Sequence, residues 1–238
     1  STQQETLFPY TTLFRSRGTA SIGVRTAGGV VLAVDKRIRS PLMERDSVEK
    51  IHKADDHIGI ASAGHVADAR QLIDFARRRA QVNELRYGEP IAVETLTKEV
   101  TDYIQQYTQV GGARPFGVAL IIAGIANGEP RLYETDPSGT PYEWKALAVG
   151  ADRGEIRDYL EEHYDEEAEL DEGVDLALSA LASVNDDGLR PEGIGLATIS
   201  VEDEQFHEHD LDEREAYLEE FDLLADEDEA DDGSEDEE

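Results

Sequence analysis

A threonine directly after a glycine opens the first strand-like run of the sequence, FRSRGTASIGV, which covers residues 14–24. A threonine hydroxyl is a weak nucleophile unless a neighbouring base takes its proton, and an N-terminal threonine can use its own free amine as that base. Cleavage between Gly18 and Thr19 would therefore turn Thr19 into a candidate nucleophile. Inside an uncleaved chain Thr19 has no free amine, and we then interpret it as an ordinary strand residue.

A second chemical candidate is the run His207-Glu208-His209-Asp210. In a strand, residues 207 and 209 share one face and could contact one metal ion. A third ligand at a fixed position relative to them is not identifiable from the sequence, so we expect no metal site and no cofactor. The run Arg77-Arg78-Arg79 is interpreted as the solvated face of a helix.

The composition excludes several classes of function. The 238 residues contain no cysteine, which excludes disulfides, thiol catalysis and thiolate metal sites. The net charge is −32, and the segment 201–238 holds 21 acidic residues against one basic residue, Arg214. Because nothing in such a chain could neutralise phosphates along a groove, we expect no nucleic-acid partner.

The acidic surface also carries few lysines, 5 against 17 arginines, and so resembles proteins of salt-loving archaea. Molar salt screens the self-repulsion of such a surface. Ten of the fourteen residues in 225–238 are acidic, and we expect this tail to be disordered. The absence of a long apolar run or a signal-peptide pattern predicts a soluble cytoplasmic protein without a membrane partner.

Hydrophobic periodicity and turn residues predict alternating groups of strands and helices. Strands are expected at 19–25, 29–34, 57–63, 117–123, 130–134, 142–149, 194–201 and 205–209. Helices are expected at 66–80, 91–107, 153–163, 172–184 and 212–221. Hairpin turns are expected at residues 26–28 and at Asn127-Gly128, and a type I turn at residues 136–139. This order predicts a layered α+β domain in which antiparallel sheets carry helices on their outer faces.

Four segments in this order resemble the archaeal proteasome α-subunit family. They are RGTASIGVRTAGGVVLAVDKR, SVEKIHKADDHIGIASAGHVADARQLIDFAR, QQYTQVGGARPFGVALIIAG and PRLYETDPSGTPYEWKA. The resemblance spans about residues 17–224, and it implies the N-terminal nucleophile hydrolase fold, a four-layer αββα sandwich. It also implies a non-catalytic subunit of the outer heptameric ring, made of one or two α isoforms, that gates entry of proteins for degradation. The implied partners are proteasome β subunits and a hexameric regulatory ATPase of the AAA class.

Residues 1–16 depart from that family, whose members begin with an ordered gate segment. TLFPYTTLFRS, residues 6–16, reads instead as the conceptual translation of a common sequencing-library adapter. We therefore expect residues 1–16 to be an artefactual leader in place of the true N-terminus. The alternative is a divergent natural leader.

Alignment with the catalytic β subunits of the same assembly places Thr19 at the nucleophile position, Asp35 at that of an acid and Lys50 at that of the catalytic lysine. This is the alternative function, a threonine peptidase processed to expose Thr19. Two differences from the sequence pattern of the β subunits disfavour this catalytic alternative. AVGADR has Ala151 where the β family has a serine, and NDDGLRPEG, residues 185–193, contains no serine. The segments SPLMERDSVEKI and QQYTQVGGARPFG also resemble α subunits in sequence.

In the α ring, pockets between neighbouring subunits receive the C-terminal tails of the ATPase. The resemblance places the pocket lysine at Lys50, the pocket glycine at Gly64 and a lining residue at His65, where an apolar residue is usual. A lysine ammonium would pair with the terminal carboxylate of the tail, and N–H groups at a helix start would favour the same charge. The alternative to a pocket role is that Lys50 is an ordinary surface lysine in a salt bridge. A structural role in shaping the ring is expected for the family loop, which comprises Tyr107, Gly111, Gly112, Arg114, Pro115 and Phe116.

Overall fold

The computed structural model describes residues 18–37, 42–43, 48–109, 114–185 and 187–225. Within these residues the strands form two five-stranded antiparallel sheets. The first sheet has the order β10 (Phe206–Glu208), β9 (Ile194–Ser200), β2 (Gly29–Asp35), β1 (Ser21–Arg25) and β8 (Ala146–Val149). The second has the order β3 (Ile51–Asp55), β4 (Ile58–Gly64), β5 (Val118–Ala126), β6 (Glu129–Thr135) and β7 (Pro141–Glu143).

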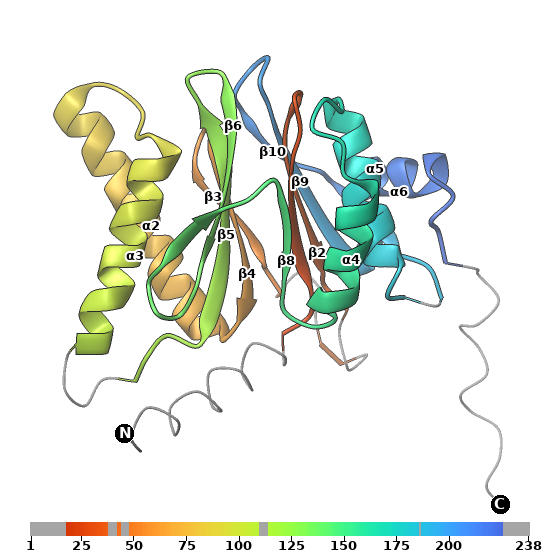
Figure 1. Ribbon diagram of the computed structural model, residues 1–238, viewed down its shortest axis with the longest axis horizontal. Coiled ribbons are helices and arrows are strands. Elements are labelled where there is room, and N and C mark those ends of the chain that lie inside the picture. The colour runs from red at the N-terminus through yellow and green to blue at the C-terminus, as the bar shows by residue number, and fades with distance from the viewer. Residues whose placement is uncertain (1–17, 38–41, 44–47, 110–113, 186, 226–238) are drawn as a thin grey trace, which may run out of the picture.

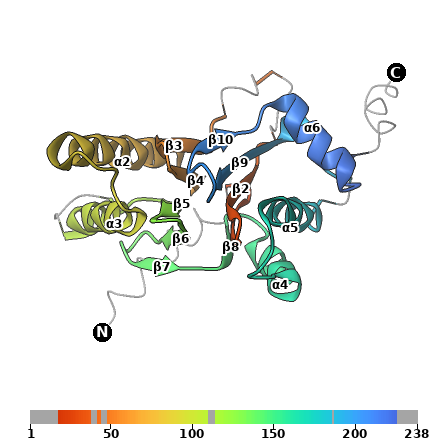
Figure 2. The same ribbon diagram turned by 90° about the horizontal axis from the view of Figure 1, so that it is seen from above.

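Helices cover the outer face of each sheet, so that the molecule has four layers (Figure 1). The second sheet is covered by α2 (Val66–Tyr87) and α3 (Val93–Gln109), and the first by α4 (Arg153–His163) and α5 (Leu170–Ala182). A shorter helix, α6 (Leu211–Glu220), follows β10 (Figure 2). It packs on the 3-10 turn Pro191–Gly193. The predicted α+β fold, a helix–sheet–sheet–helix sandwich, is confirmed.

Each of the three interfaces between layers holds its own hydrophobic core. Strand β5 contributes to two of them, because alternate side chains such as Leu120 and Ile121 point to the helices and to the other sheet. This explains why VALIIAGIA is apolar without alternation, since both faces of a central strand are covered. None of the described helices is long and apolar enough to span a membrane.

The structure has turns at the three predicted positions. Antiparallel pairing of β1 with β2 closes the hairpin at residues 26–28, where Thr26 N donates to Gly29 O over 2.9 Å. Asn127 and Gly128 both have positive φ, 56° and 75°, as a tight hairpin turn between β5 and β6 requires. In the turn at residues 136–139, Gly139 N donates to Asp136 O over 2.9 Å.

Two strand predictions need correction. The single strand expected at residues 142–149 is two strands, β7 and β8, which lie in different sheets. Between them Trp144 N donates to Leu132 O of the second sheet and Lys145 O accepts from Arg25 N of the first, so the chain crosses between the sheets there. Strand β3 was not predicted, because IHKAD reads as a polar segment although His52 is buried in it. The other elements differ from expectation only at their ends.

Candidate functional site

Lys50 lies just before β3 and directs its ammonium inward, against the start of β1 and the end of β2. Nζ donates to Thr19 O at 2.8 Å, to Thr19 Oγ1 at 2.5 Å and to Asp35 O at 3.0 Å. The structure thus brings together the three residues of the β-type alternative. All of these acceptors are neutral oxygens, and burial lowers the pKa of the Lys50 ammonium to about 8.

The carboxylate of Asp35 is turned away from this group. Asp35 is buried, and its Oδ2 accepts from Arg37 Nε over 2.8 Å while its Oδ1 accepts from Arg37 N over 2.8 Å. Only the backbone oxygen of Asp35 contacts Lys50 and the hydroxyl of Thr19. As arranged, the Asp35 carboxylate therefore cannot take a proton from either group.

Thr19 is tied into the chain on both sides. Its hydroxyl donates to Asp35 O, and its backbone nitrogen is the amide that follows Gly18. Gly18 is itself anchored, because its carbonyl accepts from Ala151 N over 2.9 Å. Regular strand geometry begins at Ser21, so Thr19 lies two residues before the strand that was expected to start with it. The arrangement has a hydroxyl beside an ammonium, but it lacks the free amine that an N-terminal threonine uses as its base.

Gly64 ends β4 directly beside this group. Its φ is 127°, and a Cβ atom there would lie 2.4 Å from Gly117 O, so the backbone conformation itself requires glycine. Gly18 also approaches Gly64 closely, because a Cβ on Gly18 would lie 2.8 Å from Gly64 N. Gly64 and Lys50 therefore both contact the Gly18–Thr19 segment, although 13 residues separate them in the sequence.

His65 follows Gly64 and is the N-cap residue of α2, with an exposed imidazole. Its backbone N donates to Gly117 O over 3.0 Å, and its Nδ1 lies 3.4 Å from the carboxylate of Asp68. The start of a 22-residue helix therefore lies next to Gly64, and its partial positive charge favours an anion there. The structure thus brings together the three residues that were predicted to bind a tail carboxylate.

Part of the family loop packs on the two helices of the second sheet. Phe116 is buried, and the Tyr107 ring meets it edge-on with ring centroids 4.9 Å apart. Arg114 Nη2 donates to Asp68 Oδ1 of α2 over 2.7 Å. Pro115 lies half-buried between them, whereas Gly111 and Gly112 fall outside the described residues. These contacts join the loop to the N-terminal turn of α2.

The three arginines at 77–79 were expected on a solvated helix face, but two of them bond to neighbouring elements. Arg77 Nε donates to Lys53 O over 2.8 Å, and Arg79 Nη2 donates to Glu99 Oε1 of α3 over 2.6 Å. Arg78 is exposed. Two of these side chains therefore hold α2 against β3 and α3.

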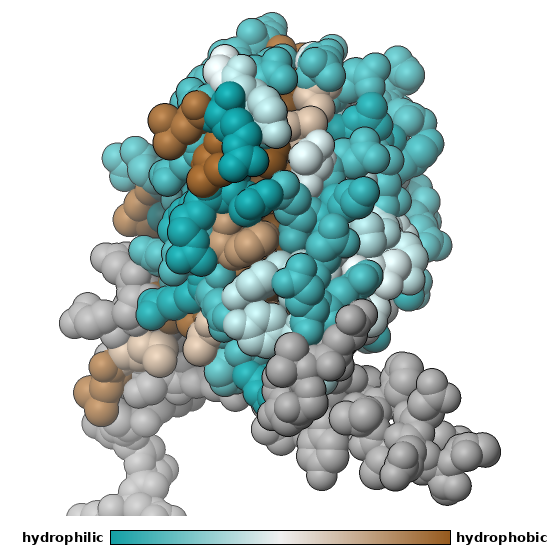
Figure 3. Space-filling model, turned by 90° about the vertical axis from the view of Figure 1, so that its left-hand side faces the viewer, coloured by the Kyte–Doolittle hydropathy of each residue, from teal (hydrophilic) through white to brown (hydrophobic). Residues whose placement is uncertain are grey.

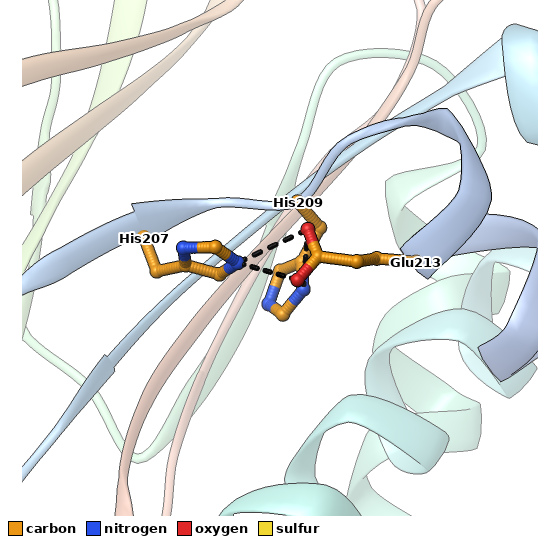
Figure 4. Close-up of side chains that lie close together, drawn as sticks. All are labelled: His207, His209 and Glu213. Atoms are coloured by element: carbon orange, nitrogen blue, oxygen red, sulfur yellow. Dashed lines mark hydrogen bonds and ion pairs between the residues drawn. The ribbon is translucent and has the colours of Figure 1, made fainter.

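The histidines near the C-terminal end have a third neighbour that sequence reasoning missed. His207, His209 and Glu213 place their ligand-type atoms within 4.8 Å of one another (Figure 4). Glu213 reaches the histidines because a capping box at the start of α6 folds its carboxylate back onto Asp210 N, 2.8 Å away. The pattern Asp-Leu-Asp-Glu at 210–213 was the signal in the sequence that could have identified it.

Comparisons with known proteins agree with one another. A family model described as "Proteasome subunit" matches residues 15–199. The chain is 82% identical over 221 residues to "Proteasome subunit alpha 1" of Haloarcula marismortui, covering 93% of this chain and 85% of that protein. It is 77% identical over 220 residues to "Proteasome subunit alpha" of Natronomonas pharaonis, covering 92% and 86%. It is 73% identical over 212 residues to "Proteasome subunit alpha 1" of Haloferax volcanii, covering 89% and 84%.

Proposed function

This chain belongs to the proteasome subunit family, as one of its α subunits, and on that premise we propose that seven α subunits of this kind form the outer ring of a cytoplasmic core particle. The ring stacks on β subunits and admits proteins to be degraded, but hydrolyses no peptide bond itself. Its outer face receives the C-terminal tails of a regulatory ATPase of the AAA class. The high identity to α subunits of salt-loving archaea supports this role over that of a β-type peptidase.

The backbone around Thr19 supports the absence of catalysis. Gly18 precedes Thr19 and is anchored through its carbonyl to Ala151, which stands where a catalytic relative would have a serine. The hydroxyl of Thr19 has a lysine neighbour but lacks the free amine of an N-terminal threonine, and the Asp35 carboxylate is occupied by Arg37. The three residues stabilise the junction of the two sheets and perform no acyl transfer.

One observation carries the proposal of tail docking, namely that the Lys50 ammonium is bound only by neutral oxygens within the described residues. A free carboxylate would supply the negative charge that these oxygens lack, and a charge-assisted hydrogen bond is about twice as strong as a neutral one. The start of α2, which follows Gly64, adds its partial positive charge to the same region. A peptide tail whose carboxylate reaches Lys50 would therefore be favoured by the ammonium and by the positive end of this helix.

Exposed apolar side chains on α2 support assembly. Leu85 is 87% exposed, Tyr87 66% and Val82 40%, and all three lie in the last two turns of this helix. Figure 3 looks onto the side of the molecule that α2 and α3 form, and brown side chains gather in its upper part among hydrophilic neighbours. Large apolar side chains that gather on an otherwise hydrophilic surface mark an interaction site. Neighbouring subunits of the particle would cover them.

Tail docking can be tested with the variant Lys50→Ala in barrels reconstituted with β subunits. We expect stimulation of protein degradation by the ATPase to fall at least about tenfold, because the loss of one charge-assisted hydrogen bond costs about 1.5–3 kcal/mol. Hydrolysis of short peptides by the same barrels should persist, since it depends on the β subunits. Both rates are measured on barrels purified by size, so that failed assembly is recognised directly.

Lys53→Ala is the matched control. Lys53 lies on β3, three residues further along, where it is exposed and pairs with Asp56 over 2.6 Å. This variant should leave stimulation unchanged. Equal stimulation in the Lys50→Ala and wild-type barrels would refute the docking assignment, and an intact mass that begins at Thr19 would refute the non-catalytic role.

A further inference from the structure

The cluster formed by His207, His209 and Glu213 joins an edge strand to a helix, far along the chain from the group around Lys50. His207 belongs to β10, His209 follows that strand, and Glu213 lies in the first turn of α6. The exposed fraction of the side chain is 54% for His207 and 40% for Glu213, whereas His209 is only 8% exposed. The cluster therefore has a buried side and a side that is open to solvent.

An ordinary ion pair explains only part of this cluster. His207 Nε2 lies 2.8 Å from Glu213 Oε1, as expected for a hydrogen bond between these two groups. His209 Nδ1 has no such partner, because it is buried without a hydrogen bond and its distance to Glu213 Oε2 is 3.8 Å. Figure 4 shows its ring directed at the Glu213 carboxylate. Buried polar nitrogens without a partner are rare, and this one lies beside two further ligand-type groups.

The other ring nitrogen of His209 has a partner that fits metal binding. His209 Nε2 lies 3.0 Å from the hydroxyl of Thr198 on β9. When Nε2 carries the proton and donates it to Thr198, the lone pair of Nδ1 is free to bind a metal ion. Metal-bound histidines usually donate their second ring N–H to an oxygen in this way, which fixes the tautomer and the ring orientation.

Glu213 is also held in place before any ligand arrives. Its backbone N donates to Asp210 Oδ1 over 3.0 Å while its own Oε2 accepts from Asp210 N over 2.8 Å. These reciprocal bonds form the capping box of α6 and fix the carboxylate beside both imidazoles. A helix cap thus also orients a potential metal ligand.

We propose that His207, His209 and Glu213 bind one divalent transition-metal ion of the zinc class, with water in the fourth position. This site goes beyond the α-ring function and does not depend on it. Two imidazoles and one carboxylate are an established zinc ligand set, and the ligands of a tetrahedral zinc ion with bonds of 2.0–2.1 Å lie roughly 3.3 Å apart. The atoms here lie within 4.8 Å of one another, so the exposed His207 side chain needs only a small movement to complete the site.

The nitrogen ligands distinguish this site from the many carboxylates of the surface. Imidazole favours zinc, copper and nickel, whereas magnesium, calcium and manganese favour oxygen. Glu208, Asp210 and Asp212 add negative charge nearby, and Arg214 is the basic residue next to them in the chain. The bound ion would connect β10 to α6 and hold the C-terminal helix against the edge of the first sheet.

The test is a calorimetric titration of the full, untagged chain with zinc chloride in molar KCl and excess magnesium, which occupies sites made only of carboxylates. We expect one zinc ion per chain. The variant Glu213→Gln should bind zinc at least about tenfold more weakly, because the loss of a residue that merely supports a ligand already costs roughly 10–100-fold and Glu213 is itself a ligand. Glutamine can retain the capping box, so α6 should stay folded. The variant His207→Gln should weaken binding by a similar factor.

His163→Gln is the control, because His163 is an exposed histidine on α4 whose Nδ1 contacts only Tyr159 O of its own helix. This variant should bind zinc as the wild type does. Cobalt added in place of zinc should give a visible absorption band typical of tetrahedral coordination in the wild type and lose it in Glu213→Gln. The proposal is overturned if the wild type has no saturable site of one ion per chain, or if both ligand variants bind zinc as tightly as the wild type.

Discussion

The charge of Lys50 depends on pH near neutrality, because its surroundings lower the pKa of the ammonium. Its ammonium lies against the carbonyl oxygens of Thr19 and Asp35, and burial lowers its pKa to about 8. The charges that influence it most are Asp35, which raises the pKa, and Lys36, which lowers it. Below pH 8 the group is charged and suited to bind a carboxylate, and above pH 8 it becomes neutral and loses that attraction.

This titration predicts how the binding of a tail depends on pH. Between pH 7 and pH 9 the affinity of the α ring for a peptide with the ATPase C-terminal sequence should fall about tenfold, because only the protonated lysine attracts the carboxylate. The peptide carboxylate stays ionised throughout, and histidines with ordinary pKa values titrate below this range. Fluorescence anisotropy of a labelled peptide measures the affinity at each pH.

Lys50→Arg provides the control for the pH profile. A guanidinium stays protonated over the whole range, so this variant should bind the peptide with an affinity that hardly changes between pH 7 and pH 9. An equal decline in wild type and Lys50→Arg would show that another group titrates, and would contradict the role assigned to Lys50.

At the scale of elements, Asp68 holds the first turn of α2 to the segment that enters β5. Its buried carboxylate accepts from Arg114 Nη2 and from Gly117 N, each over 2.7 Å. A carboxylate in the first turn also complements the partial positive charge of the helix start. The same turn lies next to Gly64 and His65, so its position also sets the shape of the proposed pocket.

Asp68→Ala should destabilise the chain by about 2–3 kcal/mol, because it leaves the buried Gly117 N–H without an acceptor. For a domain of this size that corresponds to a decrease in Tm of roughly 4–12 °C. Arg114→Ala should cost less than about 1 kcal/mol, since the arginine is more than half exposed and Gly117 keeps its acceptor. Thermal unfolding in molar KCl, followed by circular dichroism, compares the two. A larger effect of Arg114→Ala would contradict this account.

The whole molecule is governed by its net charge of −32. Acidic residues crowd the exposed helix surfaces, as in α4, where Glu161 and Glu162 are both exposed. Repulsion between such charges favours expansion of the chain, and salt reduces its range from about 10 Å at 0.1 M to about 3 Å at 1 M. The fold is therefore suited to a medium of high ionic strength.

We expect the Tm of the isolated chain to rise by several degrees as the KCl concentration increases from about 0.1 M to 1 M, over which screening becomes short-ranged. A triple variant that replaces Glu161, Glu162 and Glu167 by glutamine should show a smaller rise, because it has less repulsion to screen. Differential scanning calorimetry over a series of KCl concentrations measures both slopes. Equal slopes would indicate specific ion binding in place of general screening.

The sequence by itself determined most of the architecture. The apolar runs at 29–34 and 117–123, the 3–4-residue spacing at 66–80 and the Asn127-Gly128 turn all appear in the structure as expected. These features depend on residues close together in the chain, where periodicity selects a helix or a strand and turn residues select the reversal. The family resemblance likewise rests on contiguous segments, and the comparisons confirm it.

The tertiary structure alone decided which sheet a segment joins and where side chains converge. Residues 142–149 form two strands because each half bonds to a different sheet, which local pattern does not encode. The bonds of Lys50 to the backbone oxygens of Thr19 and Asp35 and the meeting of His209 with Glu213 likewise depend on distant strands and on a helix cap. Local propensity acts over a few residues, whereas these arrangements are set by packing between layers that the chain reaches only after folding.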